Sequence, residues 1–145
     1  MSKIQKVLLT GKTHTTPSPT GSSHDERVDI RLTTPNDPKA VHTFAAIAPH
    51  PTAEQLFAGA WSACYTSAIE LVAKEKKVTL PADRAVDIEV DLGQTGAAYF
   101  LQARLNVSLP GLPRDVAESL AHGAHEICPY SKATRGNIDV TLNVI

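Results

Sequence analysis

Residues 54–77 read EQLFAGAWSACYTSAIELVAKEKK, a nearly all-apolar run that decides the fold. Thr52, followed three residues later by Gln55 and preceded by Pro51, has the pattern of a capping box at a helix start. We therefore predict a helix from Thr52 to about Lys77. Its apolar stripe consists of Leu56, Phe57, Ala60, Trp61, Cys64, Ala68, Leu71 and Val72. A helix that is apolar on most of its circumference belongs in an interior, so we expect a sheet on one side of it and more protein on the other.

Apolar and polar residues alternate in several segments around this helix, which is the period of a half-buried strand. The clear segments are residues 27–32, 86–92, 101–109 and 138–144, and the weaker one is IQKVLLT at 4–10. The turn-like GQTGAA at 93–98 predicts that the second and third segments form a hairpin. Each strand has one polar face, which favours antiparallel pairing.

A second helix is expected to open near Pro113 and to stop at Pro129. Its apolar face consists of Val116, Ala117, Leu120, Ala121, Ala124, Ile127 and Cys128. Strands and helices that do not alternate strictly predict an α+β fold. A length of 145 residues suits one domain, residues 1–145, with a core of its own.

Two segments lack such a pattern. The proline-rich TPNDPKAVHTFAAIAPHP at 34–51 is expected to be a stiff, irregular connector that holds Phe44 in an ordered position. The polar, turn-rich THTTPSPTGSSH at 13–24 is expected to be partly mobile.

The composition excludes several classes of function. Fourteen basic and fifteen acidic residues leave a net charge of −1 without a basic stripe, so no nucleic-acid partner is expected. The N-terminal MSKIQKVLLTGK has no apolar signal core, and no apolar run reaches ~18 residues, which predicts a cytoplasmic protein without a membrane span. In that reducing compartment a permanent structural disulfide is not expected.

The two cysteines, Cys64 and Cys128, lie on the apolar faces of the two predicted helices. A cysteine on such a face is often simple hydrophobic filler. Facing positions on two packed helices would instead permit a disulfide. His125 precedes Cys128 by three residues, but a zinc site there would also need Cys64 and at least one more ligand, such as His50. A hydrolase with Cys64 as nucleophile would need a histidine base and an orienting group. No local signature supports either site. Two thiols without a strong base partner fit redox chemistry better.

Two stretches resemble the OsmC/Ohr family of organic hydroperoxide reductases, and its Ohr branch more closely: AEQLFAGAWSACY at 53–65 and AHEICPYSKATRGNIDVTL at 124–142. The resemblance implies antiparallel sheets packed around two core helices in an intertwined homodimer, with sites at the interface. It implies that Cys64 attacks the peroxide and becomes a sulfenic acid, and that Cys128 resolves this acid into a Cys64–Cys128 disulfide. Glu54 matches a glutamate that pairs with an active-site arginine in the family. The implied reductant is a dihydrolipoyl group on a partner protein, and no metal, haem or flavin is expected.

An organic hydroperoxide substrate, alkyl or lipid, also implies an apolar slot. Phe57, Trp61 and Phe44 are candidates to line it, and ordinary core packing is the alternative for each.

The sequence departs from the family at one chemically important point. The family's early loop supplies an arginine, whereas this chain has none between residues 11 and 24. Lys12, Arg27 and Arg135 are the candidates for a compensating cation, and the sequence does not choose among them. A non-catalytic thiol sensor or small-molecule binder on the same fold, and a zinc-binding structural protein, are therefore retained as alternatives.

Overall fold

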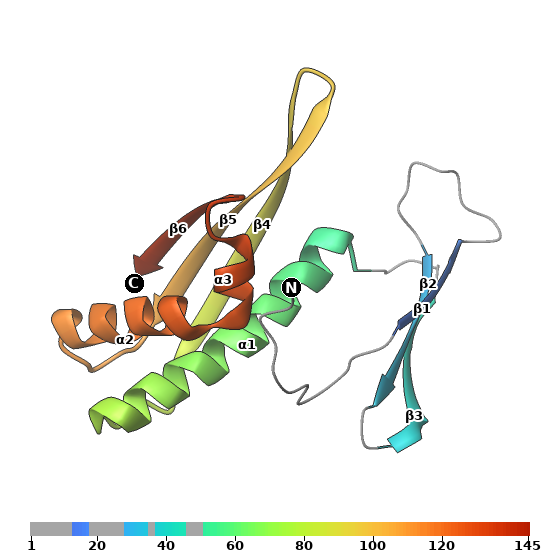
Figure 1. The fold of residues 1–145 in the computed structure, drawn as a ribbon. Helices are drawn as coiled ribbons and strands as arrows, with labels where there is room; N and C mark the ends of the chain where they lie inside the picture. The colour runs from blue at the N-terminus through green and yellow to red at the C-terminus, as the bar shows by residue number, and fades with distance from the viewer. Residues whose placement is uncertain (1–12, 18–27, 35–36, 46–50) are drawn as a thin grey trace, which may run out of the picture. The chain divides into compact units, whose positions relative to one another are not determined.

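The computed structural model describes residues 13–17, 28–34, 37–45 and 51–145. The chain divides into two compact units, Met1–Ala53 and Glu54–Ile145, and each contains a three-stranded sheet (Figure 1). The α+β class is confirmed. That residues 1–145 form a single domain stays a prediction.

The sheet of the first unit is antiparallel, with strand order β1-β2-β3. Its strands are β1 (Thr13–Pro17), β2 (Val28–Thr34) and β3 (Asp37–Phe44). The irregular connector predicted for 34–51 is therefore wrong over β3, and the polar segment 13–24 begins with a strand. Among the described strands both lie on the outside of the sheet, where a proline such as Pro38 or Pro17 is tolerated because one side needs no backbone donor. The strand predicted for 4–10 lies outside the described residues.

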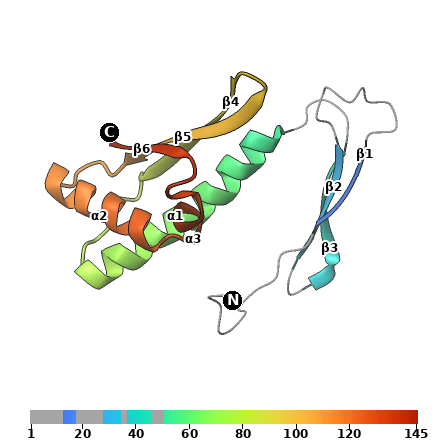
Figure 2. The same ribbon diagram turned by 45° about the horizontal axis from the view of Figure 1, so that its top comes forward.

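In the second unit, two helices lie side by side on one face of a sheet (Figures 1 and 2). Its elements are α1 (Ala53–Lys76), β4 (Ala85–Thr95), β5 (Ala98–Ser108), α2 (Arg114–Ile127), α3 (Pro129–Thr134) and β6 (Asp139–Val144). Of these, α3 was not predicted. Pro129 ends α2 as expected, but it also occupies the first position of this new helix, where its missing N–H costs nothing.

Strands β4 and β5 form the predicted hairpin, joined by the two-residue loop of Gly96 and Ala97. Gly96 has a φ of 60°, which suits the first position of a tight hairpin turn. The predicted antiparallel pairing is wrong for the last strand, because β6 runs parallel to β5. Helices α2 and α3 lie between these two strands in the chain, and such a helical crossover returns the chain in the same direction.

Helix α1 begins one residue after Thr52, as the capping-box pattern predicts. It ends in a left-handed residue, Lys77 (φ 56°), with the amide of Val78 bonded to the carbonyl of Ala73 at 2.9 Å, the pattern of a Schellman cap. By length and composition, α1 is long and apolar enough to cross a membrane. The core helix of a soluble protein can have the same length and composition. The central residues of α1 pack in the core, which favours the second interpretation.

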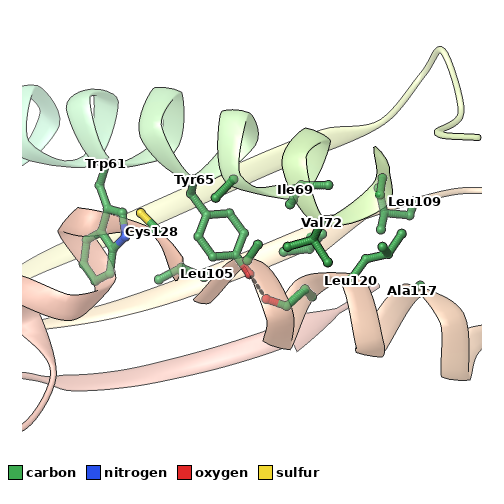
Figure 3. Packing of buried hydrophobic residues seen from close by; sticks show 14 of the residues in the cluster. Trp61, Tyr65, Ile69, Val72, Leu105, Leu109, Ala117, Leu120 and Cys128 are labelled. Carbon is green, nitrogen blue, oxygen red and sulfur yellow. Dashed lines mark hydrogen bonds between the residues drawn. The ribbon is translucent and has the colours of Figure 1, made fainter. Parts of the chain in front are cut away.

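The face that α1 buries differs from the predicted stripe. Its buried residues are Trp61, Tyr65, Ala68, Ile69, Val72 and Ala73. Leu71 belongs to the predicted stripe but is 62% exposed, whereas Tyr65 lies outside that stripe and is fully buried. The hydroxyl of Tyr65 donates to the carbonyl oxygen of Ala121 in α2 at 2.6 Å, which satisfies its polar group in the core (Figure 3).

Candidate functional site

The two free cysteines meet in the second unit, and we call them the thiol pair. The sulfur atoms of Cys64 and Cys128 lie 3.5 Å apart, although the residues belong to different segments of the chain. Cys64 is partly buried in the middle of α1, and Cys128 is fully buried. The expectation that the two thiols lie within reach of each other is thus confirmed, although Cys128 lies directly after α2 and not on its apolar face.

Cys128 occupies the corner between α2 and α3, and local chemistry explains the corner. A residue that precedes proline is driven toward extended backbone, and Cys128 has ψ 123°. Its amide still caps α2 by donating to the carbonyl of Ala124, and its carbonyl accepts the amide of Lys132 in α3. The backbone therefore fixes this cysteine from both sides.

A second contact joins the same two segments beside the thiol pair. The indole Nε1 of Trp61 in α1 donates to the hydroxyl oxygen of Ser131 in α3 at 3.1 Å, and both side chains are 0% exposed. In Figure 3 the sulfur of Cys128 lies close to Trp61, on the side of α1 that faces α2. Phe57 packs edge-on against Trp61, with ring centroids 5.8 Å apart.

The side chain of Arg135 connects the two helices on either side of Cys128. Its guanidinium donates to the carboxylate of Glu126 at 3.0 Å and to the carbonyl of His125 at 2.9 Å, so it ties the end of α3 to the last turn of α2. Of the three cations considered from the sequence, Arg135 is therefore engaged elsewhere. Lys12 and Arg27 lie outside the described residues.

The surroundings of Cys64 disfavour its thiolate. Burial raises the pKa of the Cys64 thiol, and the contact with Cys128 raises it further. A backbone hydrogen bond from Tyr130 lowers this pKa but does not reverse the direction. No lysine or arginine within the described part of the chain contributes to the shift.

Glu54 lies in the first turn of α1 and is partly buried. Ten residues separate it from Cys64, which corresponds to about 15 Å along a helix. Among the described residues, none of the ion pairs involves Glu54.

The three aromatic candidates for the apolar slot occupy different environments. Trp61 is a core residue in the second unit, and Phe57 beside it is partly buried. Phe44 belongs to the first unit, where it pairs with Ile30 across β2 and β3. Their role toward a substrate stays a prediction.

A metal centre finds no support in the described residues. No group of three or more histidine, cysteine or carboxylate side chains there could hold an ion.

The Nδ1 of His125 is buried without a hydrogen-bond partner, and burial, followed by the charge of Arg135, lowers the pKa of this histidine. A cavity of about 550 Å³ lies over the end of the β4–β5 hairpin and the start of β6, and neither cysteine lines it.

Sequence reasoning missed two contributors to the site: the hydroxyl of Ser131 and the backbone of Tyr130. A signal for Ser131 was available, since a tryptophan on an apolar helix face needs a partner for its N–H. The choice of partner depends on α3, which the sequence did not predict. No side-chain pattern could have indicated the backbone contact of Tyr130.

Residues 45–143 match the family model described as OsmC-like protein. The chain is 35% identical over 146 residues to an organic hydroperoxide resistance protein of Xanthomonas axonopodis pv. citri, covering 99% of both chains. It is 36% identical over 122 residues to the organic hydroperoxide resistance protein OhrA of Bacillus subtilis, covering 84% of each.

Solved structures with the same fold include the organic hydroperoxide resistance protein OhrB of Bacillus subtilis. The TM-score is 0.77 at 31% identity, with 96% of this chain and all of that chain covered. A putative organic hydroperoxide resistance protein of Vibrio cholerae, with captopril bound in one of its active sites, gives a TM-score of 0.72 at 28% identity, with 98% and 95% covered.

Proposed function

The chain belongs to the OsmC-like protein family, and on that premise we propose that it is a cysteine-based peroxidase that reduces organic hydroperoxides. The observation that carries the proposal is the thiol pair: two free cysteines from different segments with their sulfurs 3.5 Å apart. The names of the relatives support the class of substrate.

In the first step, the thiolate of Cys64 attacks the terminal oxygen of the hydroperoxide, RO–OH. The O–O bond breaks, the sulfur becomes a sulfenic acid, and the alkoxide takes up a proton and leaves as the alcohol. Cys64 is the better candidate for this attack because it is partly exposed, whereas Cys128 is fully buried. The partly buried Phe57 suits an apolar substrate, and Trp61 and Phe44 are proposed beside it.

In the second step, the sulfur of Cys128 attacks the sulfenic sulfur and water leaves, giving the Cys64–Cys128 disulfide. The short distance between the thiols supports this step. A dihydrolipoyl-type dithiol on a partner protein then reduces the disulfide. The cytoplasm suits the cycle, since it keeps such disulfides transient.

The first step needs a cation, because the described surroundings raise the pKa of Cys64. We propose that Lys12 or Arg27 supplies it. Since one chain's Glu54 lies about 15 Å along the helix from its own Cys64, a Glu54 that orients this cation would come from the partner chain of a homodimer. Large exposed apolar side chains on the second unit, Leu71, Leu92, Tyr99 and Phe100, favour such a partner.

The decisive test measures turnover of tert-butyl hydroperoxide, hydrogen peroxide and a lipid hydroperoxide, each with dihydrolipoamide as reductant. Cys64→Ser should abolish turnover, because a serine hydroxyl is a far poorer nucleophile near neutral pH. Its matched control is Cys128→Ser, which removes one thiol from the same pair but should still consume about one equivalent of peroxide per chain when peroxide is stoichiometric and no dithiol is present. Turnover near the wild-type level in Cys64→Ser would refute the assignment.

The raised pKa of Cys64 also favours a second candidate, a non-catalytic thiol sensor or small-molecule binder on the same fold. A sensor would form the disulfide with peroxide but would not turn over with any dithiol. The same assay separates the two functions.

A further inference from the structure

Two contacts bridge the same pair of segments about one helical turn apart. In α1, Trp61 precedes Cys64 by three residues, and in the other segment Ser131 follows Cys128 by three. Residues three apart lie on the same side of a helix. The Trp61–Ser131 hydrogen bond and the thiol pair are therefore adjacent contacts between α1 and the segment formed by Cys128 and α3.

We propose that the Trp61–Ser131 hydrogen bond is a latch that keeps the thiol of Cys128 within reach of Cys64. Trp61 and Ser131 are then positioning residues for disulfide formation. The role of the latch in peroxide reduction rests on the proposed function, whereas its effect on the thiol pair does not.

Burial gives the latch its strength. Both side chains are 0% exposed, so water cannot replace either partner when the bond is broken. The bond joins α1 directly to α3, a helix of six residues that begins immediately after Cys128. Movement of α3 away from α1 would carry Cys128 with it, because the two are linked through Pro129 and through the bond between the Lys132 amide and the Cys128 carbonyl.

The latch acts on a competition between two reactions. In the first, Cys64–SOH and Cys128–SH give the disulfide and water: an S–O bond breaks, an S–S bond forms, and the Cys128 proton leaves with the hydroxide. The Cys64 sulfur is reduced and the Cys128 sulfur is oxidised by equal amounts. In the second, another hydroperoxide transfers its oxygen to Cys64–SOH, giving the sulfinic acid and an alcohol. Keeping Cys128 close favours the first reaction by raising its effective concentration.

The first experiment uses glutathione redox buffers and no peroxide. The equilibrium between dithiol and disulfide is measured by mass spectrometry after thiol alkylation, in the full-length protein. The equilibrium constant for forming the disulfide, measured relative to glutathione, gives the effective concentration of one thiol at the other. Ser131→Ala should lower this effective concentration by roughly three- to tenfold, the factor that corresponds to the free energy of one buried hydrogen bond. Trp61→Phe should lower it similarly, and the double variant should fall no further than the larger single effect, because both changes remove one bond.

The matched control is Tyr65→Phe. It deletes another buried hydrogen bond of α1, from the Tyr65 hydroxyl to the carbonyl of Ala121, but that bond leads to α2 and not to α3. In Tyr65→Phe the effective concentration of the thiol pair should stay within about twofold of the wild-type value. Its free energy of unfolding should nevertheless fall by an amount similar to the loss in Ser131→Ala. An equal loss in Tyr65→Phe and Ser131→Ala would overturn the latch, since a general loss of stability would then explain both. Unchanged equilibria in Ser131→Ala and Trp61→Phe, or a wild-type pair that stays a dithiol throughout, would also overturn it.

The second experiment adds tert-butyl hydroperoxide and follows fluorescence, for which Trp61 is the chain's only tryptophan and lies beside the thiol pair. In Ser131→Ala the phase of disulfide formation should slow several-fold more than the phase of peroxide attack, and sulfinic acid should accumulate at lower peroxide. Equal slowing of both phases would overturn the latch. If the wild type does not react with peroxide but the glutathione result holds, the latch stands and the proposed function fails.

Discussion

Gly123→Ala tests the packing that sets the spacing of α1 and α2. A Cβ added at Gly123 would lie 2.9 Å from Cγ1 and 3.5 Å from Cγ2 of Val72 in α1. Val72 is only 4% exposed, and a β-branched residue in a helix has one strongly preferred rotamer. The clash therefore cannot be relieved by a simple rotation of the side chain, and the helices must separate by a few tenths of an ångström.

The expected magnitude is a balance of two effects. Alanine stabilises a helix interior by about 0.8–1 kcal/mol relative to glycine. Overpacking of a close-packed core costs about 1–3 kcal/mol. We expect Gly123→Ala to lower the free energy of unfolding by about 1 kcal/mol. Adding Val72→Ala should return space to the new methyl group, so the double variant should lose less than the sum of the two single losses.

The assay is urea unfolding followed by circular dichroism, with Gly59→Ala as the matched control. Gly59 is also a helix glycine, in α1, but an added Cβ there would meet nothing within 4 Å. This variant should gain about 0.8–1 kcal/mol. The reasoning is refuted if Gly123→Ala is stabilised as much as Gly59→Ala, or if the two changes at Gly123 and Val72 are additive.

Three further predictions concern titratable and redox groups. In Cys128→Ser, dimedone should trap a sulfenic acid on Cys64 and excess peroxide should over-oxidise it; a Cys64 that gives no dimedone adduct would contradict its assignment as the site of attack. Lys12→Met or Arg27→Met should raise the pKa of Cys64 by about a unit or more, measured by thiolate absorbance, and two unchanged titrations would exclude both residues. Burial raises the pKa of Tyr65 above its ordinary value of about 10, so the folded protein keeps a proton that the unfolded chain loses. Stability should therefore fall with rising pH above about 10, by up to about 1.36 kcal/mol per pH unit from this group, and Tyr65→Phe should remove that part of the slope in urea titrations; equal slopes would contradict it.

Features that depend on neighbouring residues in the chain could be predicted from the sequence. The start of α1 after Thr52, the hairpin of β4 and β5 and the break at Pro129 all follow from local backbone chemistry. The motifs around Cys64 and Cys128 also indicated the family, because they combine both thiols with their flanking residues. In β5, Ala103, Leu105 and Val107 alternate as buried residues as expected, since a strand has only two faces.

The tertiary structure decided what depends on partners far away in the chain. Periodicity cannot choose a strand's neighbour, so the parallel pairing of β6 was missed. Strand β3 was missed because its segment is proline-rich and has no clear alternation, and its pairing with β2 depends on residues elsewhere in the chain. In a helix that is apolar nearly all round, composition cannot say which side meets α2; packing buried Tyr65 and left Leu71 exposed. The bond between Trp61 and Ser131 has the same origin, because a buried N–H takes the acceptor that the folded chain places beside it.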